Sequence, residues 1–243
     1  MNKTTKTVFI TGANKGIGFE VARQLATAGY HVFMGCRDLV KGEAAAAQLR
    51  AAGLTNITLI EIDTSNPSSV QQAKQAVAAQ TDRLDVLVNN AGILGAIPQT
   101  ASVTDVSVIR HVFDTNFFGV IQTTQAFMDL LRPSPAPRIV NVSSGLGSLT
   151  QQSDPSWEYY TVKGSAYAPS KTALNAYTVA LAYELKDTAF RVNTVDPGYT
   201  ATDFNNHRGP GTIPEAAEVI IRFATADDLP TGKFYDAKGE LPW

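Results

Sequence analysis

A tyrosine and a lysine stand four residues apart at Tyr167 and Lys171, in the segment YAPSK. Apolar residues then recur at helical spacing on one face, at Leu174, Tyr177, Leu181 and Leu185. On a helix, side chains four residues apart lie one turn from each other. An ammonium beside a phenol lowers the pKa of the tyrosine, which starts near roughly 10. Such a tyrosine can exchange a proton with an alcohol or carbonyl oxygen near neutral pH, whereas a solvated surface pair is the alternative interpretation.

The composition is that of one globular domain with a sizeable core: 243 residues, 44% hydrophobic and 17% charged, with a net charge of −2. This charge predicts no binding to nucleic acid or to an anionic membrane. A single cysteine, Cys36, excludes an internal disulfide and suits a reducing compartment. With three histidines and one cysteine we predict no metal site.

The N-terminal sequence MNKTTKTVFITG passes from a short polar tail directly into a predicted strand. It lacks the apolar segment of a signal peptide, and no apolar run reaches the length needed to span a membrane. We therefore expect a cytoplasmic protein.

A glycine-rich turn, TGANKGIG at residues 11–18, follows the predicted strand 7–10 and precedes a predicted helix that closes at Gly29. Strand, glycine turn and helix together direct backbone N–H groups at a phosphate. Its glycines, Gly12, Gly16 and Gly18, form G-x-x-x-G-x-G rather than the general G-x-G-x-x-G fingerprint, so the turn alone is weak evidence.

Cations follow the second predicted strand, HVFMGC at 31–36, where a dinucleotide's adenosine ribose is bound in such folds. An acidic residue there favours NAD, but this chain has Cys36 followed by Arg37, and Lys15 adds a cation within the glycine turn. Two cations without a carboxylate favour a 2′-phosphate and hence NADP, although both could be solvated surface residues. Asp38 is expected to cap the next helix.

The alternation of strands and helices continues. NITLIEID ends a third strand at Asp63, a helix begins at Asn66-Pro67, and LDVLVNNAG places residues 89–92 at the end of a fourth strand. This predicts an α/β fold: a single-domain Rossmann-type doubly wound parallel sheet of about seven strands, with helices on both faces. The domain spans 1–243, with a cofactor half at about 7–140 and a catalytic and substrate half at about 141–243.

The second half brings polar residues to the same edge of the sheet. A long amphipathic helix is predicted at 105–131, with Asn116 just off its apolar stripe. RIVNVSS is a fifth strand with Ser143 and Ser144 at its end, and FRVNTV leads into the tight turn at 196–198.

In this order and spacing the motifs resemble the short-chain dehydrogenase/reductase family over nearly the whole chain. They are TGANKGIG, Asp63, NNAG, Asn116, the VSS serines, YAPSK and DPGYTAT. Within the family, TGANKGIG followed by CRD, TNFFG and the closing TGKFYDAKGELPW are most similar to NADPH-dependent carbonyl reductases. The resemblance implies a carbonyl reductase or ketoreductase, an oxidoreductase that transfers hydride from NADPH to a ketone or aldehyde carbon.

Four catalytic roles follow from the resemblance. Tyr167 is the general acid in reduction, and Lys171 holds the nicotinamide ribose and depresses the pKa of the tyrosine. Ser144, rather than Ser143, hydrogen-bonds the substrate oxygen, and Asn116 anchors a water that relays protons behind the lysine. Hydride delivery places negative charge on the carbonyl oxygen, and hydrogen bonds from two hydroxyl donors would stabilise that charge.

Cofactor contacts are also implied: Asp63 at the adenine, residues 90–92 along the adenosine, and residues 197–202 over the nicotinamide and diphosphate. The full predicted set is Gly12, Asn14, Lys15, Gly16, Ile17, Gly18, Arg37, Asp63, Thr64, Asn90, Ala91, Gly92, Tyr167, Lys171, Pro197, Gly198, Thr200 and Thr202.

Two segments depart from the family pattern. Ser144 and Tyr167 are 23 positions apart, which is longer than in most members. In monomeric carbonyl reductases an insertion here covers the helix face used for tetramers, and this shorter insertion favours a monomer or homodimer. Residues 199–213 are predicted to be a mobile lid, with His207 on its surface. Four aromatic residues of these segments are expected to contact a small carbonyl substrate: Trp157, Tyr160, Tyr199 and Phe204.

Two alternatives remain open. The same site could run in reverse as an alcohol or hydroxysteroid dehydrogenase using NAD, against which Arg37 and Lys15 argue. A non-catalytic NADP-binding redox sensor is the other, and it is disfavoured because the four catalytic residue types are all present.

Overall fold

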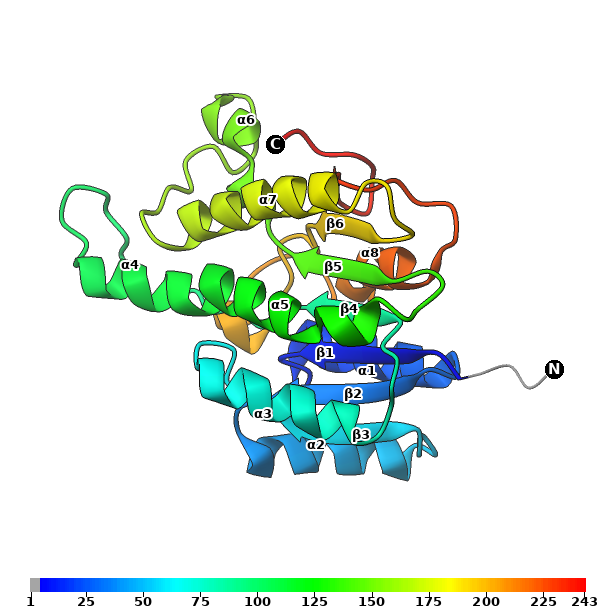
Figure 1. Ribbon diagram of the computed structural model, residues 1–243. Coiled ribbons are helices and arrows are strands. Elements are labelled where there is room, and N and C mark those ends of the chain that lie inside the picture. The colour runs from blue at the N-terminus through cyan, green and yellow to red at the C-terminus, as the bar shows by residue number, and fades with distance from the viewer. Residues whose placement is uncertain (1–4) are drawn as a thin grey trace.

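The computed structural model describes residues 5–243, so residues 1–4 of the predicted polar tail lie outside it. Within that range a seven-stranded parallel sheet runs in the order β3-β2-β1-β4-β5-β6-β7, which confirms the predicted doubly wound α/β fold (Figure 1). The strands are β1 (Thr7–Thr11), β2 (His31–Cys36), β3 (Ile57–Glu61), β4 (Val86–Asn89), β5 (Arg138–Val142), β6 (Arg191–Val195) and β7 (Phe234–Tyr235). The strand order reverses between β1 and β4, where ligands of such sheets bind.

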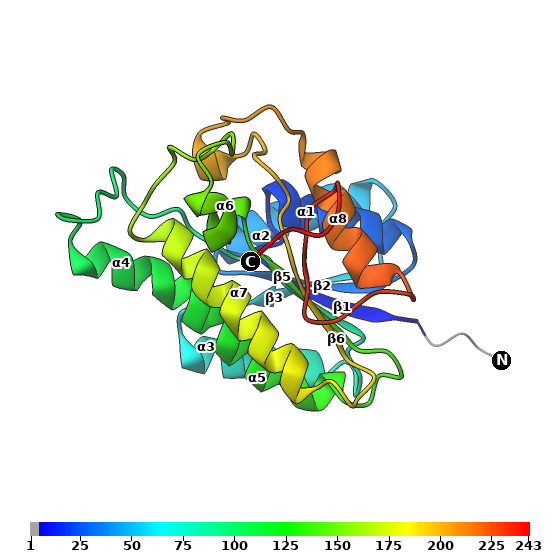
Figure 2. The ribbon, with the colours of Figure 1, turned by 90° about the horizontal axis from the view of Figure 1, so that it is seen from above.

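Helices cover both faces of the sheet (Figure 2). One face carries α1 (Gly16–Thr27), α2 (Leu39–Ala51) and α8 (Ile213–Thr225), and the other carries α3 (Pro67–Ala78), α4 (Val106–Phe113), α5 (Gly119–Leu131) and α7 (Tyr167–Glu184). Shorter elements are a π-helical turn η1 (Asp114–Phe118), the 3₁₀ turns η2 (Gly145–Gly147) and η3 (Asp203–Asn205), and α6 (Leu149–Ser153). None of the helices in residues 5–243 combines the length and the apolarity that a bilayer crossing requires.

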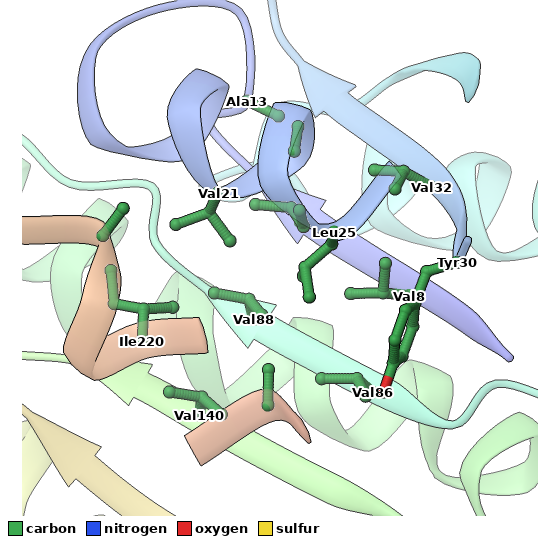
Figure 3. Packing of buried hydrophobic residues seen from close by; sticks show 14 of the residues in the cluster. Val8, Ala13, Val21, Leu25, Tyr30, Val32, Val86, Val88, Val140 and Ile220 are labelled. Atoms are coloured by element: carbon green, nitrogen blue, oxygen red, sulfur yellow. The ribbon is translucent and has the colours of Figure 1, made fainter. Parts of the chain in front are cut away.

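Each face of the sheet has its own apolar core. On one face, Leu25 of α1 and Ile220 of α8 pack over Val8 and Val88, all fully buried (Figure 3). On the other, the Phe127 ring stacks on Phe9 with centroids 4.6 Å apart. Burial on both faces explains why the strand sequences are nearly continuous apolar runs.

Helix boundaries follow the predicted capping chemistry. Asp38 accepts from the main-chain N–H of Lys41 at 3.1 Å, and Asn66 accepts from that of Ser68 at 2.9 Å. Gly29 follows α1 in the left-handed region, with φ of +88°. These boundaries were predictable because a cap depends only on residues adjacent in sequence.

Three details differ from the sequence prediction. The helix expected at 105–131 is interrupted by η1, and Asn116 within it is fully buried rather than just off the apolar stripe. The third strand ends at Glu61, two residues before Asp63. The two-residue strand β7 is too short to produce a periodic signal in the sequence.

Candidate active site

Tyr167 and Lys171 lie one turn apart at the start of α7. Lys171 is buried, with its Nζ 5.8 Å from the centre of the tyrosine ring. The same Nζ donates to the main-chain oxygen of Val142, the last residue of β5, at 2.8 Å. Ser144 follows that strand by two residues, so α7 and the end of β5 bring these side chains to one edge of the sheet.

The electrostatics of Tyr167 run opposite to the sequence prediction. Burial raises the pKa of its phenol, the charge of Asp196 raises it further, and a hydrogen bond from Ser144 lowers it in part. Burial also lowers the pKa of Lys171 to about 8, against the opposing effect of Asp196. The net shift of the Tyr167 pKa is therefore upward, opposite to the lowering predicted from the lysine, because desolvation of the phenol and the charge of Asp196 outweigh the hydrogen bond from Ser144.

Asn116 connects the π-helical turn to the first turn of α7. Its Oδ1 accepts from the main-chain N–H of Ile93 at 2.8 Å, and its Nδ2 donates to the carbonyl of Ile93 at 2.9 Å. The same Nδ2 donates to Ser170 Oγ at 3.1 Å, and Ser170 donates to the carbonyl of Tyr167 at 2.6 Å. A π-helical turn widens the helix locally and is frequent at functional sites. Here it accompanies an asparagine that is wholly withdrawn from solvent.

The glycine-rich turn packs directly against the turn that follows β4. Asn90 Nδ2 donates to the carbonyls of Thr11 and Gly12 at 2.9 and 3.2 Å. A Cβ at Gly18 would lie 2.4 Å from both the Gly12 oxygen and Asn90 Nδ2, so only glycine fits. Gly16 has φ of +57°, a conformation that glycine adopts without strain. The turn thus has the close backbone approach that a dinucleotide diphosphate requires.

A cavity of about 450 Å³ lies beyond the ends of β2 and β3. It is lined by Arg37, Glu61, Asp63, Asn66, Ser68, Ser69, Gln72, Ala73 and Ala76. Arg37 and Asp63 therefore share one hollow, as expected for residues around an adenosine. Lys15 is not in this lining: its Nζ pairs with Asp203 Oδ2 at 3.1 Å, so the two predicted cations face different surroundings.

The remaining predicted cofactor residues surround this edge of the sheet. A Cβ at Gly92 would lie 3.4 Å from Asn116 Oδ1 and 3.6 Å from Lys171 Nζ, which places this glycine against these two side chains. Thr202 approaches the glycine turn, with its Cγ2 3.8 Å from a Cβ built at Gly16. The others lie on the glycine turn or next to β3, β4 and β6: Asn14, Ile17, Thr64, Ala91, Pro197, Gly198 and Thr200.

Aromatic residues of the insertion and the predicted lid form two sets of ring contacts, one of which includes Tyr167. The Phe204 ring lies 5.5 Å from the Tyr167 ring, and Tyr159 lies between Trp157 and Tyr199 with centroids 5.5 and 6.0 Å away. The structure does not bring Tyr160 into this row, because its ring faces Lys163 Nζ at 4.3 Å.

Sequence reasoning missed Gln99 and the charge of Asp196 as parts of this region. The DPG turn was a signal for Asp196, whereas nothing in the sequence around Gln99 indicates a role. Among residues 5–243 no group of three or more His, Cys, Asp or Glu side chains is placed to hold a metal ion.

A family model described as a short chain dehydrogenase matches residues 6–212. The chain belongs to the short-chain dehydrogenase family. Its members are oxidoreductases that use a nicotinamide cofactor, and the glycine turn and the cavity at Arg37 fit such a group. The resemblance predicted from the sequence is confirmed.

Several relatives of this short-chain dehydrogenase match over most of their length. Salutaridine reductase from Papaver bracteatum is 30% identical, with 93% of each chain covered. A short-chain dehydrogenase from Penicillium roqueforti is 37% identical, covering 91% of this chain and 89% of the relative. The crystal structure of NADPH-bound carbonyl reductase from chicken fatty liver has a TM-score of 0.84 at 26% identity, with 98% and 99% covered.

Proposed function

We propose that this short-chain dehydrogenase is an NADPH-dependent carbonyl reductase that reduces a ketone or aldehyde, with Tyr167 as the proton donor. The observation that carries the proposal is the grouping of Tyr167 and Ser144, two hydroxyl donors joined by a hydrogen bond, with Lys171 Nζ 5.8 Å from the centre of the tyrosine ring. A protonated phenol is the form needed for reduction, whereas oxidation of an alcohol needs a base.

Each residue of the site has a separate role in the reaction at the substrate oxygen. NADPH, when bound, supplies the hydride to the carbonyl carbon. The Tyr167 hydroxyl donates its proton to the oxygen that becomes negative, and the Ser144 hydroxyl donates a hydrogen bond to the same atom. The Lys171 ammonium stabilises the phenolate that remains, and Asn116 holds the first turn of α7 through Ser170.

The choice of NADPH over NADH rests on Arg37. This cation lines the cavity at the ends of β2 and β3, where a guanidinium can bind a 2′-phosphate through two parallel hydrogen bonds. A similar solved structure from Shigella flexneri is described as complexed with NADP, at 28% identity and a TM-score of 0.84. Both observations support a 2′-phosphate site in this chain.

The test is the oxidation of NADPH and then NADH by the purified protein, against ketones, quinones, aldehydes and ketoesters. We expect turnover with NADPH on at least one class. Tyr167→Phe should lose about 100-fold or more in kcat while its NADPH affinity stays within about threefold. Tyr183→Phe makes the same change on an exposed part of α7 and should leave the rate unchanged. A Tyr167→Phe variant with most of its activity would exclude this residue as the acid.

We also propose that the protein assembles no further than a homodimer. The insertion packs on the N-terminal half of α7, where Gly147 of η2 has no room for a side chain because a Cβ would lie 2.9 Å from Lys171. Val179 and Tyr183 farther along α7 stay exposed. Light scattering of the purified protein should give one or two chains, and a tetramer would contradict the proposal.

A further inference from the structure

Gln99 lies in the segment between β4 and α4, with 8% of its surface exposed. Its Oε1 accepts from the main-chain N–H groups of Tyr167 at 3.0 Å and Ala166 at 3.3 Å. Its Nε2 donates to the carbonyls of Leu94 at 2.7 Å and Ala96 at 3.2 Å. A carboxamide has two acceptor positions and two donor hydrogens, so this side chain uses all four. If the amide were turned over, its NH₂ group would face the two main-chain N–H donors and its oxygen would face the two carbonyls. These contacts therefore determine the orientation of the amide.

These bonds supply a cap that α7 lacks in its own sequence. The first N–H groups of a helix have no partner within it. The residue that precedes α7 is Ala166, which has no side-chain oxygen to accept from them. Gln99 provides that oxygen from 68 positions away in the sequence, and its own carbonyl accepts from Ser165 N–H at 3.0 Å.

The capped residue is Tyr167 itself, which is held on two sides. Gln99 accepts from its N–H group, and Ser170 donates to its carbonyl oxygen. Asn116 bonds to Ser170 and to both main-chain polar atoms of Ile93, six positions before Gln99 in the sequence. The segment 93–99 therefore links Asn116 at one end with the start of α7 at the other.

Gly164 supports the same contact by its lack of a side chain. A Cβ at this position would lie 2.9 Å from Gln99 Oε1 and 3.5 Å from its Cβ. Gly164 is not among the glycines with positive φ, so its requirement is steric rather than conformational. An alanine at 164 would displace the amide oxygen from the two N–H groups that it caps.

We propose that Gln99 is a positioning residue for Tyr167, one that sets where the phenol stands without touching the substrate. The inference rests on the proposed function, since it needs Tyr167 to be the proton donor. Proton and hydride transfer tolerate little displacement, and a shift of about 1 Å can lower a rate about 100-fold. Cofactor binding uses the glycine turn and the Arg37 cavity, so it should depend much less on this cap.

The experiment compares Gln99→Met, which keeps the length but forms none of the four bonds, with Gln99→Glu, which keeps the accepting oxygen. We expect kcat of Gln99→Met to fall about 30-fold to 100-fold while KM for NADPH stays within about threefold. Gln99→Glu should retain kcat within about tenfold of the unmodified protein, because its carboxylate still accepts at the helix N-terminus. Rates are taken at a temperature where circular dichroism shows each variant folded.

The matched control is Asp38→Ala, which removes a cap from α2 instead. It should lower Tm but leave kcat unchanged. If kcat of Asp38→Ala instead fell together with its stability, the proposal would be overturned. A folded Gln99→Met variant with unchanged kcat would overturn it as well.

Gly164→Ala provides an independent perturbation if Gln99→Met fails to fold. It should lower kcat in the unmodified protein and in Gln99→Glu, where the oxygen that the new methyl group displaces is still present. It should have little further effect in a folded Gln99→Met variant, which lacks that oxygen, and an equal loss there would contradict a role through Gln99. Full activity in Tyr167→Phe would instead contradict the proposed function. A failure of the proposed function can therefore be distinguished from a failure of the role of Gln99.

Discussion

Lys15 of the glycine turn is paired with Asp203 of the predicted lid, with 3.1 Å between Nζ and Oδ2. Asp203 also faces His207 Nε2 at 3.0 Å through its other oxygen. The hydrogen bond from Lys15 is the largest cause of the lowered pKa of this carboxyl. The lysine predicted to bind a 2′-phosphate therefore has a carboxylate partner on the segment 199–213. A phosphate and Asp203 would compete for the same ammonium.

Asp203→Asn should consequently strengthen the binding of NADPH. Because both side chains are more than half exposed, the pair is weak and the expected gain is about threefold. NADH has no 2′-phosphate, so its affinity should not change. Fluorescence titration of the two cofactors at low salt measures the difference, and an equal gain for NADH would show that Lys15 does not contact the phosphate.

Arg37→Asp should reverse the cofactor preference. The substitution removes the cation at the end of β2 and provides a carboxylate that can accept from the ribose hydroxyls of NADH. We expect kcat/KM with NADPH to fall at least about tenfold and that with NADH to rise. Arg50→Asp makes the same charge change at the end of α2, outside the cavity lining, and should leave the ratio unaltered.

The rate of reduction should decline as the pH rises through about 8, where burial places the pKa of Lys171. The sign follows from the lowered pKa: the ammonium is complete below that value and is lost above it, and a neutral amine stabilises the phenolate less. The decline should approach about tenfold for each pH unit. Lys171→Arg keeps its charge, so its profile should extend to higher pH even at a lower rate. A decline that begins only near pH 10 would contradict the lowered pKa.

Gly18→Ala should disrupt the cofactor site. The added methyl group would lie 2.4 Å from two polar atoms, one of them a backbone oxygen, so the turn must move. We expect NADPH affinity to fall by more than about tenfold, together with a lower Tm. Gly29→Asn is the control, because a Cβ there meets no atom within 4 Å and asparagine tolerates the left-handed conformation. Unchanged affinity in Gly18→Ala would mean that the turn does not hold the diphosphate.

Local chemistry accounts for most of the agreement between sequence and structure. The caps at Asp38 and Asn66 involve residues two or three positions away, and the strands are short apolar runs separated by turn residues. Parallel strands with alternating helices leave few topologies, and in all of them the strand ends carrying Arg37, Asn90 and Ser144 meet at one edge. This is why a chain of modest motifs could predict both the fold and the place of the site.

The sequence by itself determined the order of the elements, the family and the types of residue at the site, because these depend on spacing and on neighbours along the chain. Only the tertiary structure decided that Asn116 is buried in a π-helical turn, that Gln99 caps the start of α7 and that Lys15 pairs with Asp203. The same holds for the raised pKa of Tyr167, which the spacing of YAPSK predicted in the wrong direction. Desolvation and long-range hydrogen bonds depend on which distant segments surround a group, and spacing along the chain does not contain that information.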